Sequence, residues 1–89
     1  MTPDQICAEQ EVSVGLHLRF IPAIEEEFAP ALVWISGSRA ALHFLARVVQ
    51  ALSEDDPLPA SFQLAPRSAG QFHLSPDAEL GIYLECTDD

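Results

Sequence analysis

One segment with helical periodicity, placed between short segments that alternate, constrains the fold of this chain most strongly. Between residues 38 and 52, apolar residues recur three or four positions apart, which is the spacing of one face of an α-helix. Ser36 and Ser38 stand at its start, where a serine side chain can cap the first turn. Pro57 and Pro59 follow its end and cannot continue a helix. The apolar stripe consists of Leu42, Leu45, Val49 and Leu52.

Segments in which apolar and polar residues alternate lie on both sides of this helix. Alternation predicts a strand with one buried face, and it runs through residues 11–20 and 79–86. Shorter apolar runs at 31–36, 62–64 and 72–74 are interpreted as three further strands. The predicted order is ββαβββ. We therefore expect an α+β fold with a mainly antiparallel five-stranded sheet and one helix packed on one face.

A chain of 89 residues has the length of a single folding unit. We predict one domain over residues 1–89, with a flexible N-terminal segment at 1–9 and a flexible C-terminal tail at 87–89. Residues 21–30 are interpreted as a long acidic loop and residues 66–70 as a turn.

The predicted second strand is apolar on both faces, with Val33 and Ile35 on one face and Leu32 and Trp34 on the other. Such a strand is either central and covered on both sides, or it leaves one face exposed and adhesive. Five strands span roughly 20–24 Å, whereas one helix covers about 10–12 Å. A homodimer, in which a second copy covers the remaining surface, is therefore a further expectation.

The charge of the chain selects its partners. Fourteen acidic residues stand against four arginines and no lysine, and the formal net charge is -10. Such a field repels nucleic acids and anionic membranes and accelerates encounter with basic proteins. Two acidic runs are expected either to steer a basic protein partner or simply to be solvated loops. They consist of Glu25, Glu26 and Glu27, and of Glu54, Asp55 and Asp56.

Trp34 and Tyr83 are candidate anchors for that protein partner. In the predicted register both side chains point away from the helix and are exposed. Exposed aromatic side chains with a polar rim are typical of protein interfaces, so these two are candidates for binding. The same face would carry Leu32, His17 and His73, with Glu11, Arg19, Glu79 and Glu85 as the rim. A register slip of one residue would instead bury Trp34 in the core.

No motif for catalysis or metal binding is visible. His17, His43 and His73 lie on separate elements without ligand spacing, and no phosphate-binding loop or activated nucleophile is present. We predict no catalytic residues, no metal site, no cofactor and no enzymatic activity.

The remaining basic and thiol groups have structural interpretations. Arg39, His43 and Arg47 share one helical stripe and are expected to pair with the acidic loops. Cys7 and Cys86 are expected to be free thiols in a reducing cytosol, although adjacent termini would allow a disulfide. The start of the chain does not resemble a signal peptide, and its apolar runs are short of a membrane span, so a cytoplasmic location is expected.

A family resemblance rests on three quoted stretches, ISGSRAALHFLARVVQALSEDD, SFQLAP and FHLSPDAELGIYLE, within about residues 35–85. This part of the chain resembles the core of immunity protein family thirty-two of the bacterial polymorphic toxin systems. The resemblance implies a cytosolic protein that binds and neutralises a toxin domain.

Together with the acidic charge, this predicts an immunity or antitoxin-like protein that binds and occludes a basic toxin domain. The alternative is a non-enzymatic homodimeric assembly domain without a toxin partner. A nucleic acid mimic is a weaker rival, because two short acidic clusters do not follow a phosphate-like spacing.

Overall fold

The computed structural model describes residues 1–67 and 71–88 of the chain. Within them the elements follow in this order: α1 (Pro3–Glu9), β1 (His17–Ile21), the 3-10 helix η1 (Glu25–Glu27), β2 (Leu32–Ser36), α2 (Arg39–Ser53), β3 (Ala60–Leu64), the 3-10 helix η2 (Gln71–His73) and β4 (Ile82–Cys86).

The predicted central helix is confirmed as α2. Its first turn is capped by Ser38, whose side-chain oxygen accepts a hydrogen bond of 3.1 Å from the Ala41 amide. The buried face of α2 packs on β3 and β4, and its largest fully buried side chain is that of Val48. Leu42 and Val49 belong to the predicted apolar stripe but remain half exposed, so the stripe is wider than the surface that the core covers.

The predicted five-stranded sheet with one helix is wrong. In the described part of the chain, β1 pairs with β2 and β3 pairs with β4, giving two separate antiparallel two-stranded sheets. The segment predicted as a fourth strand forms η2 instead, and it meets the first hairpin through a single bridge between Leu16 and Leu74. Leu74 belongs to neither sheet, so this bridge does not join the β1–β2 and β3–β4 pairs.

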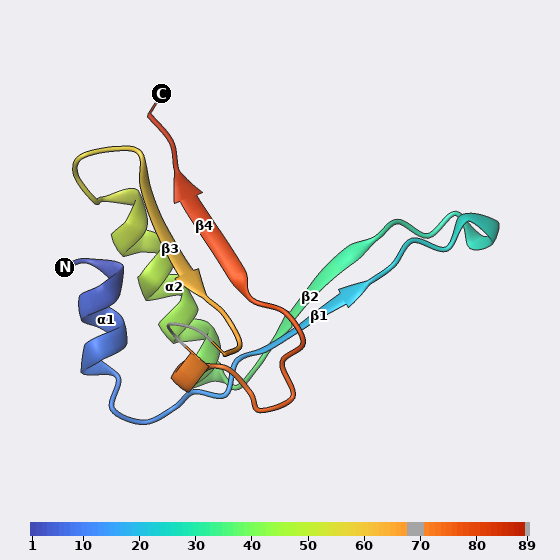
Figure 1. Ribbon diagram of the computed structural model, residues 1–89, viewed down its shortest axis with the longest axis horizontal. Helices are drawn as coiled ribbons and strands as arrows, with labels where there is room; N and C mark the ends of the chain where they lie inside the picture. Colours follow the sequence, from blue (N-terminus) through green and yellow to red (C-terminus); the bar gives the residue numbers. More distant parts are fainter. Residues whose placement is uncertain (68–70, 89) are drawn as a thin grey trace.

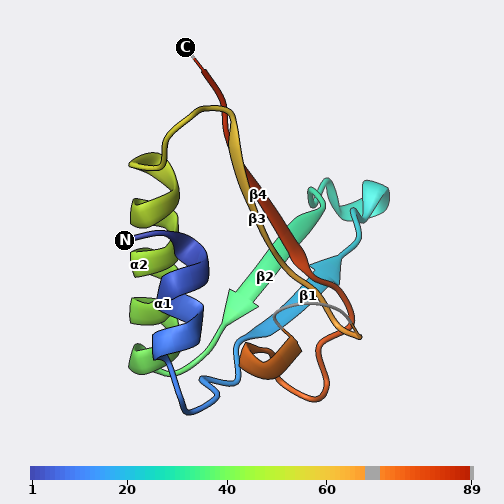
Figure 2. The ribbon, with the colours of Figure 1, turned by 60° about the vertical axis from the view of Figure 1, so that its left-hand side comes forward.

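The N-terminal segment 1–9, predicted to be flexible, contains the helix α1. Thr2 and Gln5 form a reciprocal capping box, and Pro3 occupies the first turn, where its missing N–H costs no hydrogen bond. Ile6 is buried and docks α1 beside α2, as Figure 2 shows. At the other end, Thr87 and Asp88 are exposed without regular secondary structure, and residue 89 of the predicted tail lies outside the described residues.

The strands are shorter than predicted. The first begins at His17 rather than at residue 11, and the last begins at Ile82 rather than at residue 79. The alternation in β4 is confirmed, because Ile82 and Leu84 pack against the core while Tyr83 is exposed. Of the predicted turn at 66–70, residues 66 and 67 form a turn, and residues 68–70 lie outside the described part.

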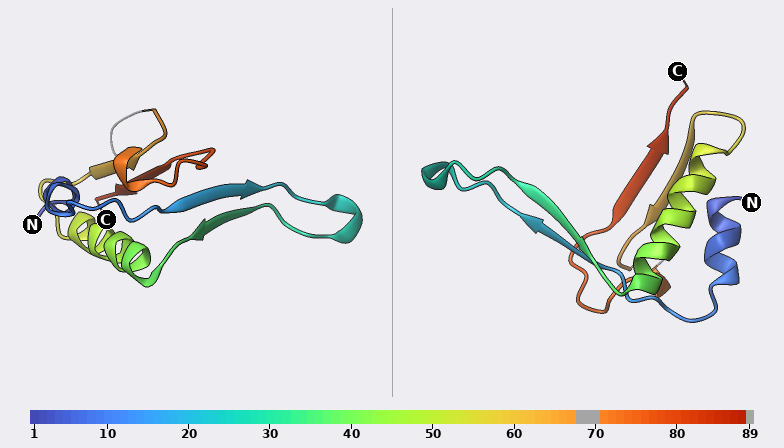
Figure 3. Two further views of the ribbon diagram at one scale, coloured as in Figure 1. Left: turned by 90° about the horizontal axis from the view of Figure 1, so that it is seen from below. Right: turned by 180° about the vertical axis from the view of Figure 1, so that it is seen from behind.

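The first hairpin projects from the body of the molecule (Figure 1). Leu16 and Leu18 at its base are fully buried, whereas its far end extends away from both helices, and Figure 3 shows the same from below and from behind. The Cα radius of gyration is 14.3 Å, whereas a compact chain of this length has a radius of about 12 Å. None of the helices in the described residues is both long enough and apolar enough to cross a membrane.

Candidate protein-binding arm

The projecting hairpin, residues 17–36, is called the arm. Its strands pair Leu18 with Ile35 and Phe20 with Val33, and directly opposed residues share one face of a ribbon. These four residues form the inner face of the arm. Arg19 and Trp34, with Ile21 and Leu32, form the outer face.

The inner face continues the hydrophobic core into solvent. Leu18 is 0% exposed, but Phe20 is 55%, Val33 62% and Ile35 40% exposed. The chain therefore places large apolar side chains on a surface that nothing in the described structure covers. Exposed apolar residues that occur singly need no explanation, but a contiguous patch marks an interaction surface.

The outer face carries Trp34. Its indole ring lies under the Arg19 guanidinium, whose central carbon is 5.5 Å from the ring centroid, and this is cation–π distance. Trp34 is 48% exposed, so the alternative in which a register slip buries it in the core is wrong. An arginine stacked on an exposed tryptophan combines the two residue types that most often dominate binding energy at protein interfaces.

The tip of the arm, residues 24–29, is closed by backbone hydrogen bonds. The amides of Ile24 and Ala29 each donate to the other's carbonyl oxygen, at 2.9 and 3.0 Å. Between them Glu25, Glu26 and Glu27 form η1, and Phe28 follows with a φ of 55°. A bulky residue with positive φ is strained. Because the Phe28 side chain is 93% exposed, packing within the chain does not compensate for this strain.

The second predicted acidic run lies far from the tip. Glu54, Asp55 and Asp56 follow the C-terminal end of α2, at the opposite end of the molecule from the tip in Figures 1 and 3. They are held locally, since the Gln50 side-chain amide donates to Glu54 at 3.4 Å and the Asp56 amide donates to Asp55 at 2.9 Å. The two acidic runs therefore do not form one surface.

Tyr83 and Glu85 are exposed on the outward face of β4. In the described structure they belong to a different sheet from Trp34, and the expected common aromatic face is not formed. Tyr83 is opposed by Gln63 and Glu85 by Ser61, so this face is mainly polar.

His73, predicted on the exposed sheet face, is instead a buried core residue. It is 3% exposed and its ring lies against Phe44 and Phe72, with centroids 4.6 and 4.9 Å away. Its Nε2 is 3.1 Å from the Cys7 carbonyl oxygen, and because a carbonyl only accepts, Nε2 carries the proton. His73 thus ties α1 to η2.

The expected pairing of Arg47 with the acidic loops does not form in the described structure. Arg47 lies 3.8 Å from Glu9 of α1, rather than from either acidic run.

Cys7 and Cys86 are free thiols. Burial raises the pKa of the Cys7 thiol from 9.0 to about 11, with a further contribution from the negative charge of Asp4.

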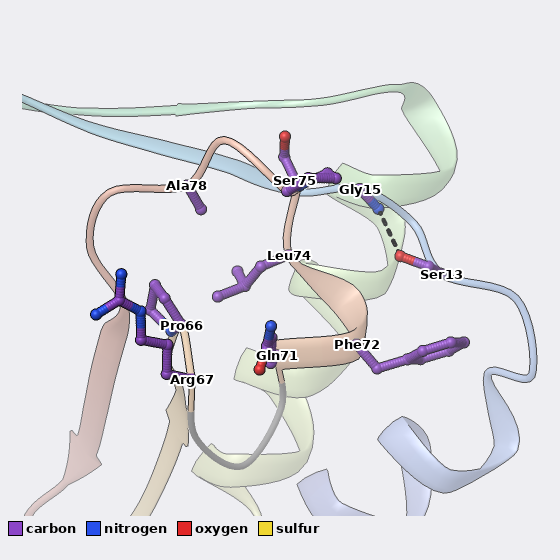
Figure 4. Close-up of a pocket in the computed structure, with 10 residues that line it drawn as sticks. Ser13, Gly15, Pro66, Arg67, Gln71, Phe72, Leu74, Ser75 and Ala78 are labelled. Carbon is purple, nitrogen blue, oxygen red and sulfur yellow. Dashed lines mark hydrogen bonds between the residues drawn. The ribbon is translucent and has the colours of Figure 1, made fainter.

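A hollow of about 560 Å³ lies beside η2, and Figure 4 shows Arg67 and Phe72 on opposite sides of it with Leu74 between them. Its walls include Ser13, whose hydroxyl accepts a hydrogen bond from the Gly15 amide at 3.3 Å. Its described lining residues include no carboxylate, imidazole or thiol, and the described part of the chain has no group of three metal-ligating side chains. The arm is therefore the stronger candidate site.

Comparisons of the chain with protein-family models, with curated proteins and with solved structures found no match.

Proposed function

We propose that this protein is a non-catalytic protein-binding module of the immunity type, which captures a basic bacterial toxin domain in the cytoplasm and occludes it. The tip and the outer face of the arm make the contact. The observation that carries the proposal is the tip itself, where Phe28 is 93% exposed directly after three glutamates on a projecting hairpin.

The tip combines the two contributions that a fast inhibitor needs. Glu25, Glu26 and Glu27, added to a net charge of -10, attract a basic surface and raise the association rate, by about 10- to 1,000-fold at low salt. Phe28 then offers a large apolar side chain that can fill a pocket, as anchoring aromatic residues do at interfaces. Because the tip extends from the body, it can enter a concave site such as an active-site cleft.

The outer face extends this contact along the arm. Trp34 and the stacked Arg19 lie on it, together with Leu32. An enzyme cleft lined by basic groups would meet carboxylates at the tip and an aromatic side chain behind it. The family resemblance over residues 35–85 supports the same class of function, and inhibition by occlusion needs no acid–base pair on this chain.

The test is rescue of growth. The protein encoded by the gene next to that of this chain is taken as the candidate toxin, and its C-terminal domain is expressed inducibly in a laboratory bacterium, with and without this chain. The wild-type chain is expected to restore growth, and Phe28→Ser is expected to weaken binding of the purified toxin at least about tenfold. Val12→Ser is the matched control, because Val12 is 72% exposed but lies outside the arm.

A pair of charge variants separates steering from general acidity. Glu25→Gln, Glu26→Gln and Glu27→Gln together should lower the association rate about tenfold at low salt. Glu54→Gln, Asp55→Asn and Asp56→Asn remove the same charge at the opposite end and should change the rate much less. Equal effects of the two triple variants, or a toxin that kills despite this chain, would show that the tip is not an inhibitory site.

A further inference from the structure

We propose that two copies of this chain exchange arms, so that the inner face of each arm packs on an apolar groove in the body of the other copy. The groove is called the α2–β4 groove and is lined mainly by Val49, Leu52, Leu84 and Cys86. The inference does not depend on the toxin-binding proposal, because it uses the inner face of the arm rather than its tip or outer face.

The groove is a second apolar surface of the same chain. It has a volume of about 240 Å³ and lies between the C-terminal half of α2 and β4. Val49 is 46% exposed, and Leu42, two turns earlier on the same side of the helix, is also 46% exposed. The apolar stripe of α2 thus continues past the core and ends in solvent on the side of β4.

The amount of exposed surface indicates that something covers it. The accessible surface is 6308 Å², whereas a compact monomer of 9.7 kDa exposes about 5,100 Å². The excess is on the order of 1,200 Å², and a stable interface of standard size covers about 800 Å² of each partner. A dimer of that size would return each copy to roughly the exposure of a compact domain.

The geometry favours a second copy over closure within one chain. The arm and the pair formed by α2 and β4 diverge from a common base, so the arm points away from its own groove (Figures 1 and 3). A two-fold axis gives each copy one arm to donate and one groove to receive. Val33 and Ile35 are about 7 Å apart along the arm, and Leu84 and Cys86 of the groove are about the same distance apart along β4, so the two apolar surfaces have similar lengths.

Charge predicts how this dimer responds to salt. Each copy carries a net charge of -10, so two copies repel one another. Screening shortens the range of that repulsion, and the dimer should therefore tighten as salt rises. Capture of a basic toxin should weaken under the same change, so failure of one proposal is distinguishable from failure of the other.

Sedimentation velocity tests the dimer between about 1 and 200 µM, where an interface of this size is expected to associate. The wild type should change from monomer to dimer across this range. Phe20→Ser in the arm and Val49→Ser in the groove should each raise the dissociation constant at least about 30-fold, because each change acts twice in a symmetric dimer. Val12→Ser, exposed outside both surfaces, should leave it unchanged.

Mixing the two variants tests the exchange itself. In a mixed dimer one arm–groove contact is intact and the other carries both changes, and residues in contact lose their shared interaction only once. Native mass spectrometry of an equimolar mixture of Phe20→Ser and Val49→Ser chains should therefore show mixed dimers well above the statistical half. Unchanged circular dichroism of each variant shows that the body is folded.

Two results would overturn the proposal. A wild-type chain that stays monomeric at the highest concentration has no arm exchange. A mixture in which mixed dimers reach only the statistical fraction shows that the arm and the groove do not contact each other, and that the chains associate through another surface.

Discussion

Replacing Leu18 by Ala tests where the core ends and the arm begins. Leu18 is 0% exposed, and Leu→Ala changes at fully buried positions cost about 3–5 kcal/mol in free energy of unfolding. Phe20 lies two residues further along the same face and is 55% exposed. Since full burial of a Phe side chain contributes about 1.5–3 kcal/mol, Phe20→Ala should cost only about 1 kcal/mol in the monomer.

These magnitudes predict different outcomes for two adjacent positions of one face. A domain of this length has a free energy of unfolding of about 5–10 kcal/mol, so Leu18→Ala should remove about half of it. Urea titration followed by far-ultraviolet circular dichroism reports mainly on α2. Fluorescence of Trp34, the single tryptophan, reports on the arm. Both are measured in dilute solution, below the concentrations at which the proposed dimer would form.

In Leu18→Ala the fluorescence transition should come at lower urea than the dichroism transition, because the arm loses its anchor while Leu16, Val48 and Leu64 still hold the body. In Phe20→Ala the dichroism transition should stay close to that of the wild type. If Phe20→Ala costs as much as Leu18→Ala in dilute solution, the arm is packed on its own body and the reasoning is wrong.

Four further predictions concern single residues: Gly81, Gly15, Cys7 and Phe28. A Cβ at Gly81 would lie 2.7 Å from Cα of Ala65, a backbone contact that no rotamer relieves, so Gly81→Ala should cost at least about 2 kcal/mol in urea titration. At Gly15, with a φ of 63° and open space around it, Gly→Ala should cost only about 1 kcal/mol. Cys7, whose pKa is raised to about 11, stays largely protonated at pH 8, so its alkylation should be about 100-fold slower in the folded chain than in urea, and equal rates would show that its thiol is exposed. Phe28→Gly relieves the strain of a positive φ at an exposed position, so the free energy of unfolding should not fall, and a loss above about 1 kcal/mol would show that Phe28 is packed.

The sequence predicted the elements whose signals are local. The helix α2 was predictable because its apolar spacing extends over four turns and a serine caps its first turn. In β4, alternation showed which side chains face the core. Thr2 and Gln5 also formed a readable capping box, but α1 has only seven residues, and its stability comes from docking Ile6 rather than from its own sequence.

The assembly of the sheet could not be predicted, because pairing depends on contacts between distant residues. Two apolar positions, Phe72 and Leu74, are too few to distinguish a strand from the 3-10 helix that forms there. His73 carries no sequence signal of burial, since its environment is built by Phe44 and by the Cys7 carbonyl, 29 and 66 residues away.

The candidate site was partly visible in the sequence. Glu25–Glu27 and Trp34 lie on the arm, whereas Tyr83 and the run of Glu54, Asp55 and Asp56 lie elsewhere. The sequence does not single out Phe28 as an exposed anchor, because its spacing of four residues from Ile24 also suits the apolar side of a helical turn. Its position at the end of the acidic run, followed by Ala29 and Pro30, gives no signal for a left-handed backbone.

The acidity and the exposed arm are linked by a physical requirement. A hairpin with unpaired edges and apolar residues on both faces is a template for association with other chains. Among the described residues, the arm places all three of its carboxylates at the tip, where two arms meeting end to end would bring like charges together. Its inner face near the base carries no charge, so orderly pairing can occur there while end-to-end stacking of arms is opposed. The charge distribution that, in the proposed function, directs a basic protein to the tip would therefore also restrict how copies of this chain associate.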